Sequence, residues 1–93
     1  MNIFVGNLTV RTQLKQLRKL FAGFGTVSRV MIIRESKAVL PRIFCWVVMK
    51  ERSEALRAIE GLDQSKFMQQ IILVNEAVLV SSLPKYTNIR YAL

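Results

Sequence analysis

The sequence contains no histidine, and Cys45 is its only cysteine. A single thiol excludes an intramolecular disulfide, and without imidazole ligands we expect neither a metal site nor a bound cofactor. The 6 acidic residues are scattered, and none stands beside a nucleophile or base with which it would form a catalytic pair. Glu51 and Glu54 lie where a helix is expected to start, and acids suit the helix dipole there. These absences argue against an enzyme.

Long hydrophobic runs are also missing. No segment reaches the roughly 18 apolar residues that predict a membrane span. The first four residues provide no basic leader ahead of an apolar run, so we do not expect a signal peptide. The lone thiol falls on the apolar side of an expected strand, which suits a reducing compartment. We therefore expect a cytoplasmic protein that does not associate with membranes.

Negative charge is scarce compared with positive charge. The chain has 14 lysines and arginines against 6 aspartates and glutamates, a formal net charge of +8 over 93 residues. So positive a field on a short chain favours an anionic partner, above all nucleic acid. The apolar content of 52% is ample for a buried core and argues against disorder. The composition predicts one folded domain with an anionic partner.

Hydrophobic periodicity predicts four strands and two helices. The expected strands are residues 2–8, 27–34, 42–49 and 70–75, and the expected helices are residues 12–24 and 53–59. The order strand, helix, strand, strand, helix, strand is the split βαβ arrangement. We predict an α+β fold, a ferredoxin-like βαββαβ sandwich. Its four-stranded antiparallel sheet has the first and third strands at the centre and both helices on one face.

The two helices have expected boundaries and apolar stripes. Thr12 is expected to cap the first helix, with Thr9 as an earlier candidate, and Gly23 and Gly25 are expected to end it. Gly61 is expected to end the second helix. The residues expected to pack against the sheet are Leu14, Leu17, Leu20, Phe21 and Phe24 in the first helix, and Ala55, Leu56 and Ile59 in the second. These are typical core residues, so we assign them no functional role.

The third expected strand, residues 42–49, decides the functional interpretation. Successive side chains of a strand point to opposite faces of the sheet. The inward set is Ile43, Cys45, Val47 and Met49, and the outward set is Arg42, Phe44, Trp46 and Val48. The inward set is ordinary core. The outward set places a cation and two large rings on a face that no helix covers, where a covered sheet would carry valine and isoleucine.

Side chains of the other strands extend this outward face. Phe4 joins Phe44 and Trp46 on the adjacent central strand. The polar and flexible side chains expected around the rings are Arg29, Arg42, Met31, Asn2 and Asn75. Bases stack on rings, arginines neutralise phosphates, and amides hydrogen-bond base edges. The face therefore predicts binding of a single-stranded nucleic acid, RNA or DNA, because stacking tolerates either sugar.

Two of the strands resemble the signatures of a known family, the RNA recognition motif. The family's hexamer is matched by Ile3–Leu8, and its octamer by Arg42, Phe44, Cys45, Trp46 and Val47. Ile43 stands where the octamer has glycine, and Met49 where it usually has an aromatic residue. The resemblance covers about residues 2–77 and looks like the short single-domain bacterial members. It implies base stacking on Phe4, Phe44 and Trp46 and phosphate binding by Arg42.

An alternative use of the same apolar face is a protein–protein interaction or a homodimer. Peptide-binding variants of the family carry an acidic first helix and an Arg-x-Phe loop after the second. This chain has a basic first helix and Ser65-Lys66-Phe67 in the loop, so we favour RNA. We expect residues 1–77 to form the domain and residues 78–93 an apolar and basic tail. The sequence leaves open whether this tail packs on the domain, continues the sheet or makes a homo-oligomer.

Overall fold

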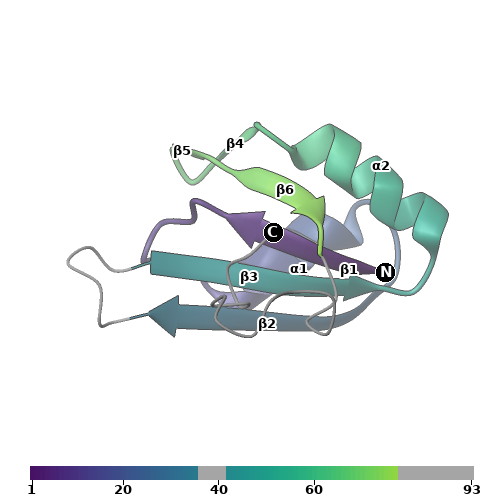
Figure 1. The fold of residues 1–93 in the computed structure, drawn as a ribbon, viewed down its shortest axis with the longest axis horizontal. Coiled ribbons are helices and arrows are strands. Elements are labelled where there is room, and N and C mark those ends of the chain that lie inside the picture. The colour runs from purple at the N-terminus through teal and green to yellow at the C-terminus, as the bar shows by residue number, and fades with distance from the viewer. Residues whose placement is uncertain (36–41, 78–93) are drawn as a thin grey trace, which may run out of the picture.

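The computed structural model describes residues 1–35 and 42–77 (Figure 1). Its elements are β1 (Asn2–Gly6), α1 (Leu14–Ala22), β2 (Val27–Glu35), β3 (Arg42–Met49), α2 (Arg52–Leu62), β4 (Lys66–Phe67), β5 (Gln70–Ile71) and β6 (Leu73–Glu76). One antiparallel sheet has the order β2-β3-β1-β6, which confirms the predicted fold class with β1 and β3 at its centre. Neither helix in this part of the chain is long and apolar enough to cross a membrane.

Both helices contribute to one core on the inward face of the sheet. The buried strand residues of this core include Ile3, Val5, Ile43, Cys45, Val47, Met49 and Val74, and its helix residues are Leu17, Phe21, Ala55, Ala58 and Leu62. The predicted inward set of β3 is therefore confirmed. Complete burial of a side chain such as Leu17 or Phe21 is worth about 1.5–3 kcal/mol. The helices thus cover the inward face, and neither described helix covers the outward face.

Gln13, rather than Thr12, caps α1. The Gln13 amide donates to Oε1 of Gln16 at 2.8 Å, as in a capping box. Thr12 is instead completely buried, and its hydroxyl has no partner within the described ranges. The prediction for Leu14 is also wrong, because its side chain is 51% exposed. Helical spacing does not show whether the sheet extends beneath the first turn of the helix.

The second helix is longer than predicted and buries a different stripe. α2 continues through Gly61 to Leu62, and Asp63 follows as its C-cap. A Cβ at Gly61 would lie 3.0 Å from the ring of Phe24, so this glycine provides space for a neighbour and does not stop the helix. The buried positions are Ala55, Ala58 and Leu62, whereas Leu56 is 44% exposed. Small alanines here let the helix lie close to the sheet.

A short hairpin replaces the first part of the predicted strand 70–75. β4 and β5 pair through a turn in which Met68 and Gln69 have φ of 51° and 69°, and the sheet resumes only at β6. The buried Ile72 separates β5 from β6, and its amide donates to the Ser65 carbonyl at 2.9 Å. The predicted facing is nevertheless right: Ile72 and Val74 are buried, and Leu73 and Asn75 are exposed.

Two predicted segments lie outside the described residues. These are most of the loop expected before β3, at residues 36–41, and the tail at residues 78–93. The domain boundary after residue 77 and the proposed roles of the tail therefore stay predictions.

Candidate nucleic-acid interface

Four outward residues form one row across all four strands of the sheet. Phe4 lies opposite Trp46 on β3 and opposite Asn75 on β6. Trp46 in turn lies opposite Met31 on β2. Residues directly opposite each other in antiparallel strands have Cβ atoms about 4.5–5.5 Å apart, close enough for side-chain contact. The sheet therefore brings together Asn75, Phe4, Trp46 and Met31, called the ring row below, and all four were predicted site residues.

Phe44 lies beside the ring row, at the outward position of β3 two residues before Trp46. The ring centroids of Phe4 and Phe44 are 5.5 Å apart with the planes tilted by 37°. Those of Phe4 and Trp46 are 6.4 Å apart and nearly edge-on, at 81°. Aromatic pairs at such distances contribute about 0.5–1.5 kcal/mol beyond area burial. The three predicted rings therefore form one cluster in which Phe4 contacts both of the others.

The rings differ in how much surface they offer. Phe4 is only 8% exposed although it lies outside the core cluster, whereas Phe44 and Trp46 are half-buried and Met31 is 37% exposed. A Cβ at Gly6 would lie 2.9 Å from the Phe4 ring. Without that Cβ, the Phe4 ring can lie close over the backbone of β1. Within the cluster, Phe44, Trp46 and Met31 therefore offer more accessible apolar surface than Phe4 does.

Cationic and amide side chains flank the ring row. Asn2 and Arg29 both lie opposite Val48, in the next outward row. Arg29 is exposed and forms no ion pair with any residue that the structure describes. Asn75 is exposed and Asn2 is half-buried. Arg42 begins β3, but its side chain lies outside the described part, so its predicted phosphate contact stays a prediction.

The inward side of β3 tolerates the departures from the family's octamer. Ile43 is 5% exposed and pairs in register with Arg34, so the ladder is not interrupted where the family has glycine. Met49 is completely buried in the core. Burial raises the pKa of the Cys45 thiol from 9.0 to about 12, against a smaller lowering by a backbone hydrogen bond at Met31. Cys45 is therefore an inert core residue.

Two outward apolar residues beside the rings were not among the predicted site residues. Leu73 lies opposite Gly6 and is 46% exposed, and Ile33 lies opposite Phe44 and is half-buried. Strand alternation puts both on the outward face. Only the strand register reveals that they flank Phe44, and the register cannot be read from the sequence when the connecting loops are irregular. They widen the apolar surface at the Phe44 end of the cluster.

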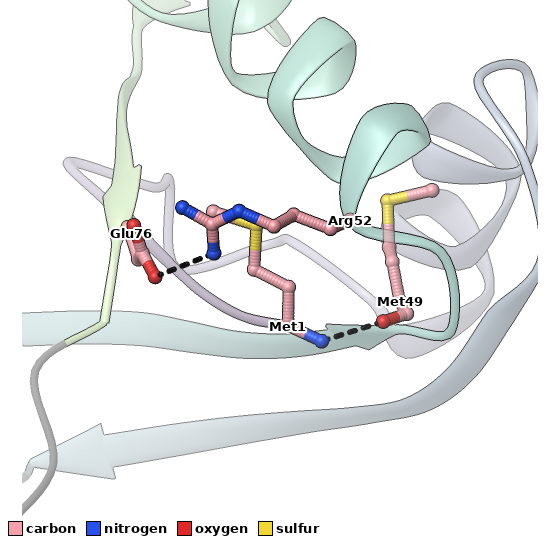
Figure 2. Close-up of polar contacts among 4 residues, drawn as sticks. All are labelled: Met1, Met49, Arg52 and Glu76. Carbon is pink, nitrogen blue, oxygen red and sulfur yellow. Dashed lines mark hydrogen bonds and ion pairs between the residues drawn. The ribbon is translucent and has the colours of Figure 1, made fainter.

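Polar contacts fix the opposite end of the sheet (Figure 2). The Met1 ammonium group donates to the Met49 carbonyl at 2.7 Å, which joins the start of β1 to the end of β3. Arg52 reaches from the start of α2 to Glu76 at the end of β6, with 3.5 Å between Nη1 and Oε2. Both side chains of this pair are more than half exposed, so it contributes at most about 1 kcal/mol. Arg52 therefore connects the start of α2 to the end of β6.

This chain is similar to a known protein family and to proteins named as RNA-binding. The family model described as RNA recognition motif matches residues 3–73. The "Putative RNA-binding protein RbpA" of Nostoc sp. is 38% identical over 77 residues, which are 83% of this chain and 76% of that protein. The protein of the same name from Synechocystis sp. is 34% identical over 77 residues, with coverage of 83% and 76%.

Solved structures give the same result. The crystal structure of RNA Binding Protein PG1 is 34% identical with a TM-score of 0.76, and the match covers 85% of this chain and 95% of that one. The Sex-lethal protein/RNA complex is 28% identical with a TM-score of 0.72, over 82% of this chain and 47% of that one. The resemblance inferred from the two strand signatures is confirmed. This chain belongs to the RNA recognition motif family.

Proposed function

We propose that the protein binds single-stranded RNA on the outward face of its sheet, with the ring row as the centre of the site. The observation that carries the proposal is the register that aligns Asn75, Phe4, Trp46 and Met31 across all four strands. The family is one of binding domains, and its RNA-binding relatives support a binding function over an enzymatic one. One similar structure is a complex with RNA.

Stacking supplies the affinity in this proposal. Two successive bases lie on Trp46 and Phe44, and each base–ring stack is worth about 1–3 kcal/mol. Met31 flanks the base on Trp46, because the two residues are directly opposite each other. Phe4, which is largely covered, contributes the limited part of its ring that remains exposed and holds the other rings in place.

Charges and amides position the strand and read its bases. Arg29 and Arg42 neutralise phosphates at the margins of the rings, with the salt dependence that counterion release brings. Asn75, directly opposite Phe4, and Asn2 hydrogen-bond base edges. Contacts to the 2′-hydroxyl favour RNA, although single-stranded DNA also binds because the stacking does not depend on the sugar.

A titration of the full chain with pooled short RNAs, followed by backbone amide shifts, tests the proposal. We expect the largest shifts at Phe4, Met31, Phe44, Trp46 and Asn75. The shifts should move with added RNA until saturation, and single-stranded DNA should move the same amides less. Shifts that avoid the ring row, or no binding by any oligonucleotide, would overturn the proposal. In the latter case a protein-binding role for this face becomes the better explanation.

A further inference from the structure

The two rings of β3 have apolar neighbours on the side of β2, the strand next to β3 at one end of the sheet order (Figure 1). Met31 lies opposite Trp46. Ile33 lies opposite Phe44. Met31 is 37% exposed and Ile33 is half-buried, so both keep accessible apolar surface beside the rings. We call these two residues the β2 wall. A base stacked on either ring therefore has an apolar side chain at its β2 edge.

The cations of β2 that the structure describes lie away from the β2 wall. The guanidinium of Arg34 donates to the carbonyls of Val10 and Thr12 at 3.1 and 3.0 Å. Both carbonyls belong to the segment before α1, so this charge is held away from the rings. Arg29 lies in the next outward row, past Met31. Of the β2 side chains described, those of the wall are the ones that lie opposite the rings.

An apolar wall distinguishes the edges of a base. The C5–C6 edge of a pyrimidine carries only carbon and hydrogen, whereas the corresponding edge of a purine carries the N7 acceptor beside a carbonyl oxygen or an amino group. A polar edge turned to the wall would lose hydrogen bonds to water without replacing them. A pyrimidine with its C5 edge on the wall loses none, and a methyl group at C5 gains apolar contact.

We propose that the β2 wall selects pyrimidines that carry a methyl group at C5. The inference rests on the proposed function and names the bases that the stacking site prefers. For the base on Phe44, the C5 methyl group lies against Ile33. For the base on Trp46, it lies against Met31. The Watson–Crick edge then points away from β2, in the direction of β6, where Asn75 is one of the proposed edge readers. Thymine of single-stranded DNA and 5-methyluracil of RNA both carry this group.

The test varies the methyl group and the sugar separately. Four labelled octamers are titrated against the full chain by fluorescence anisotropy: uracil and 5-methyluracil, each on ribose and on deoxyribose. We expect the methyl group to raise affinity about fourfold on both sugars, because two methyl groups that are each half buried contribute about twofold apiece. A gain on deoxyribose alone would identify thymine of DNA as the ligand, and a gain on ribose alone a methylated RNA.

Three variants show where the gain arises, since a methyl group also strengthens stacking on any ring. Ile33→Thr keeps a β-branched residue but places a hydroxyl on the wall, and it should lower the ratio of the 5-methyluracil affinity to the uracil affinity about twofold. Met31→Gln makes a similar change opposite Trp46 and provides a second test if Ile33→Thr does not fold. Ile71→Thr is the matched control at an exposed isoleucine of β5, outside the four-stranded sheet, and should keep the ratio.

An intermolecular nuclear Overhauser effect provides a readout that does not depend on affinity. In the complex with 5-methyluracil, the C5 methyl protons should show contacts to the side chains of Ile33 and Met31 and none to Ile71. Contacts to neither wall residue, an unchanged ratio in the folded wall variants, or an equal fall in Ile71→Thr would overturn the inference.

The failure of the inference differs from the failure of the proposed function. Equal affinity for the methylated and plain octamers on both sugars would overturn the methyl preference and leave RNA binding in place. Binding of the pooled RNAs but of none of the octamers would do the same. If neither the pool nor any octamer bound, the proposed function would fail and the inference with it.

Discussion

At the scale of single residues, the rings of β3 are where affinity for RNA is expected to originate. Trp46→Ala and Phe44→Ala should each weaken binding by about 1–3 kcal/mol, or roughly 5- to 150-fold, because each removes one stacking partner. Fluorescence anisotropy with a labelled RNA measures the change. Leu56→Ala is the matched control, since it removes an exposed apolar side chain from α2 and should bind normally. A folded Trp46→Ala protein with normal affinity would rule out the stacking role.

The buried thiol of Cys45 gives a second prediction at this scale. Because burial raises its pKa from 9.0 to about 12, the folded state disfavours the thiolate and the unfolded state does not. Stability is therefore unaffected below about pH 9 and falls as the pH rises from there towards 12, by about 1 kcal/mol at pH 10. Urea denaturation at pH 8 and pH 10 measures the loss.

The variant Cys45→Ala isolates this contribution, because lysines and tyrosines titrate in the same range. The difference in stability between the native chain and Cys45→Ala should shrink on going from pH 8 to pH 10. Ellman's reagent should also react slowly at pH 8 unless denaturant is present. Fast reaction of the native protein would contradict the burial of the thiol.

At the scale of elements, the turn after α1 depends on a glycine for its contact with α2. A Cβ at Gly25 would collide with the side chain of Glu54, which accepts the Thr26 amide hydrogen bond. Gly25→Ala should therefore cost about 1–2 kcal/mol of unfolding free energy through the displaced side chain and the lost hydrogen bond. Urea denaturation measures it.

Gly23 offers a control two residues away. A Cβ there meets only the Leu20 carbonyl oxygen at 3.5 Å, and its φ of −65° suits any residue. Gly23→Ala should be neutral or slightly stabilising, by up to about 1 kcal/mol, because alanine restricts the unfolded chain. Equal losses in the two variants would mean that the Glu54 contact is unimportant.

The strands were easier to predict than the helices and the hairpin. Alternation with a period of two assigned the facing of β3 correctly at every described side chain, because a strand has only two faces. A helix has flanks, and apolar residues there, such as Leu14 and Leu56, satisfy the spacing without being buried. The β4–β5 turn uses Met68 and Gln69 with positive φ, whereas asparagine and glycine are the usual signals. No sequence pattern therefore predicted the β4–β5 turn.

The face on which each candidate site residue lies was predictable, but the arrangement of these residues across the sheet was not. Phe4, Trp46 and Asn75 could each be placed on the outward face from alternation alone. That they stand in one row follows from strand register, which depends on the turns. The low exposure of Phe4 could not be predicted, because alternation gives the face on which a side chain lies and not how much of it stays accessible.

At the scale of the whole molecule, the net charge of +8 predicts that RNA binding weakens steeply with salt. Each phosphate neutralised on a single strand contributes about −0.7 to the slope of log K against log salt. Arg29→Gln should therefore make the slope shallower by about 0.7, and Arg57→Gln on α2 should leave it almost unchanged. Titrations at several salt concentrations measure both slopes. Identical slopes for the two variants would remove Arg29 from the phosphate contacts.

The strands that carry the rings are both interior strands, with β2 on one side and β6 on the other. Their backbone amides and carbonyls are already paired along both edges, so an extended peptide cannot lengthen the sheet next to Phe4 or Trp46. A ligand meets only side chains at this surface. The chemistry of the surface can therefore change one side chain at a time during evolution, while the scaffold that presents it stays closed.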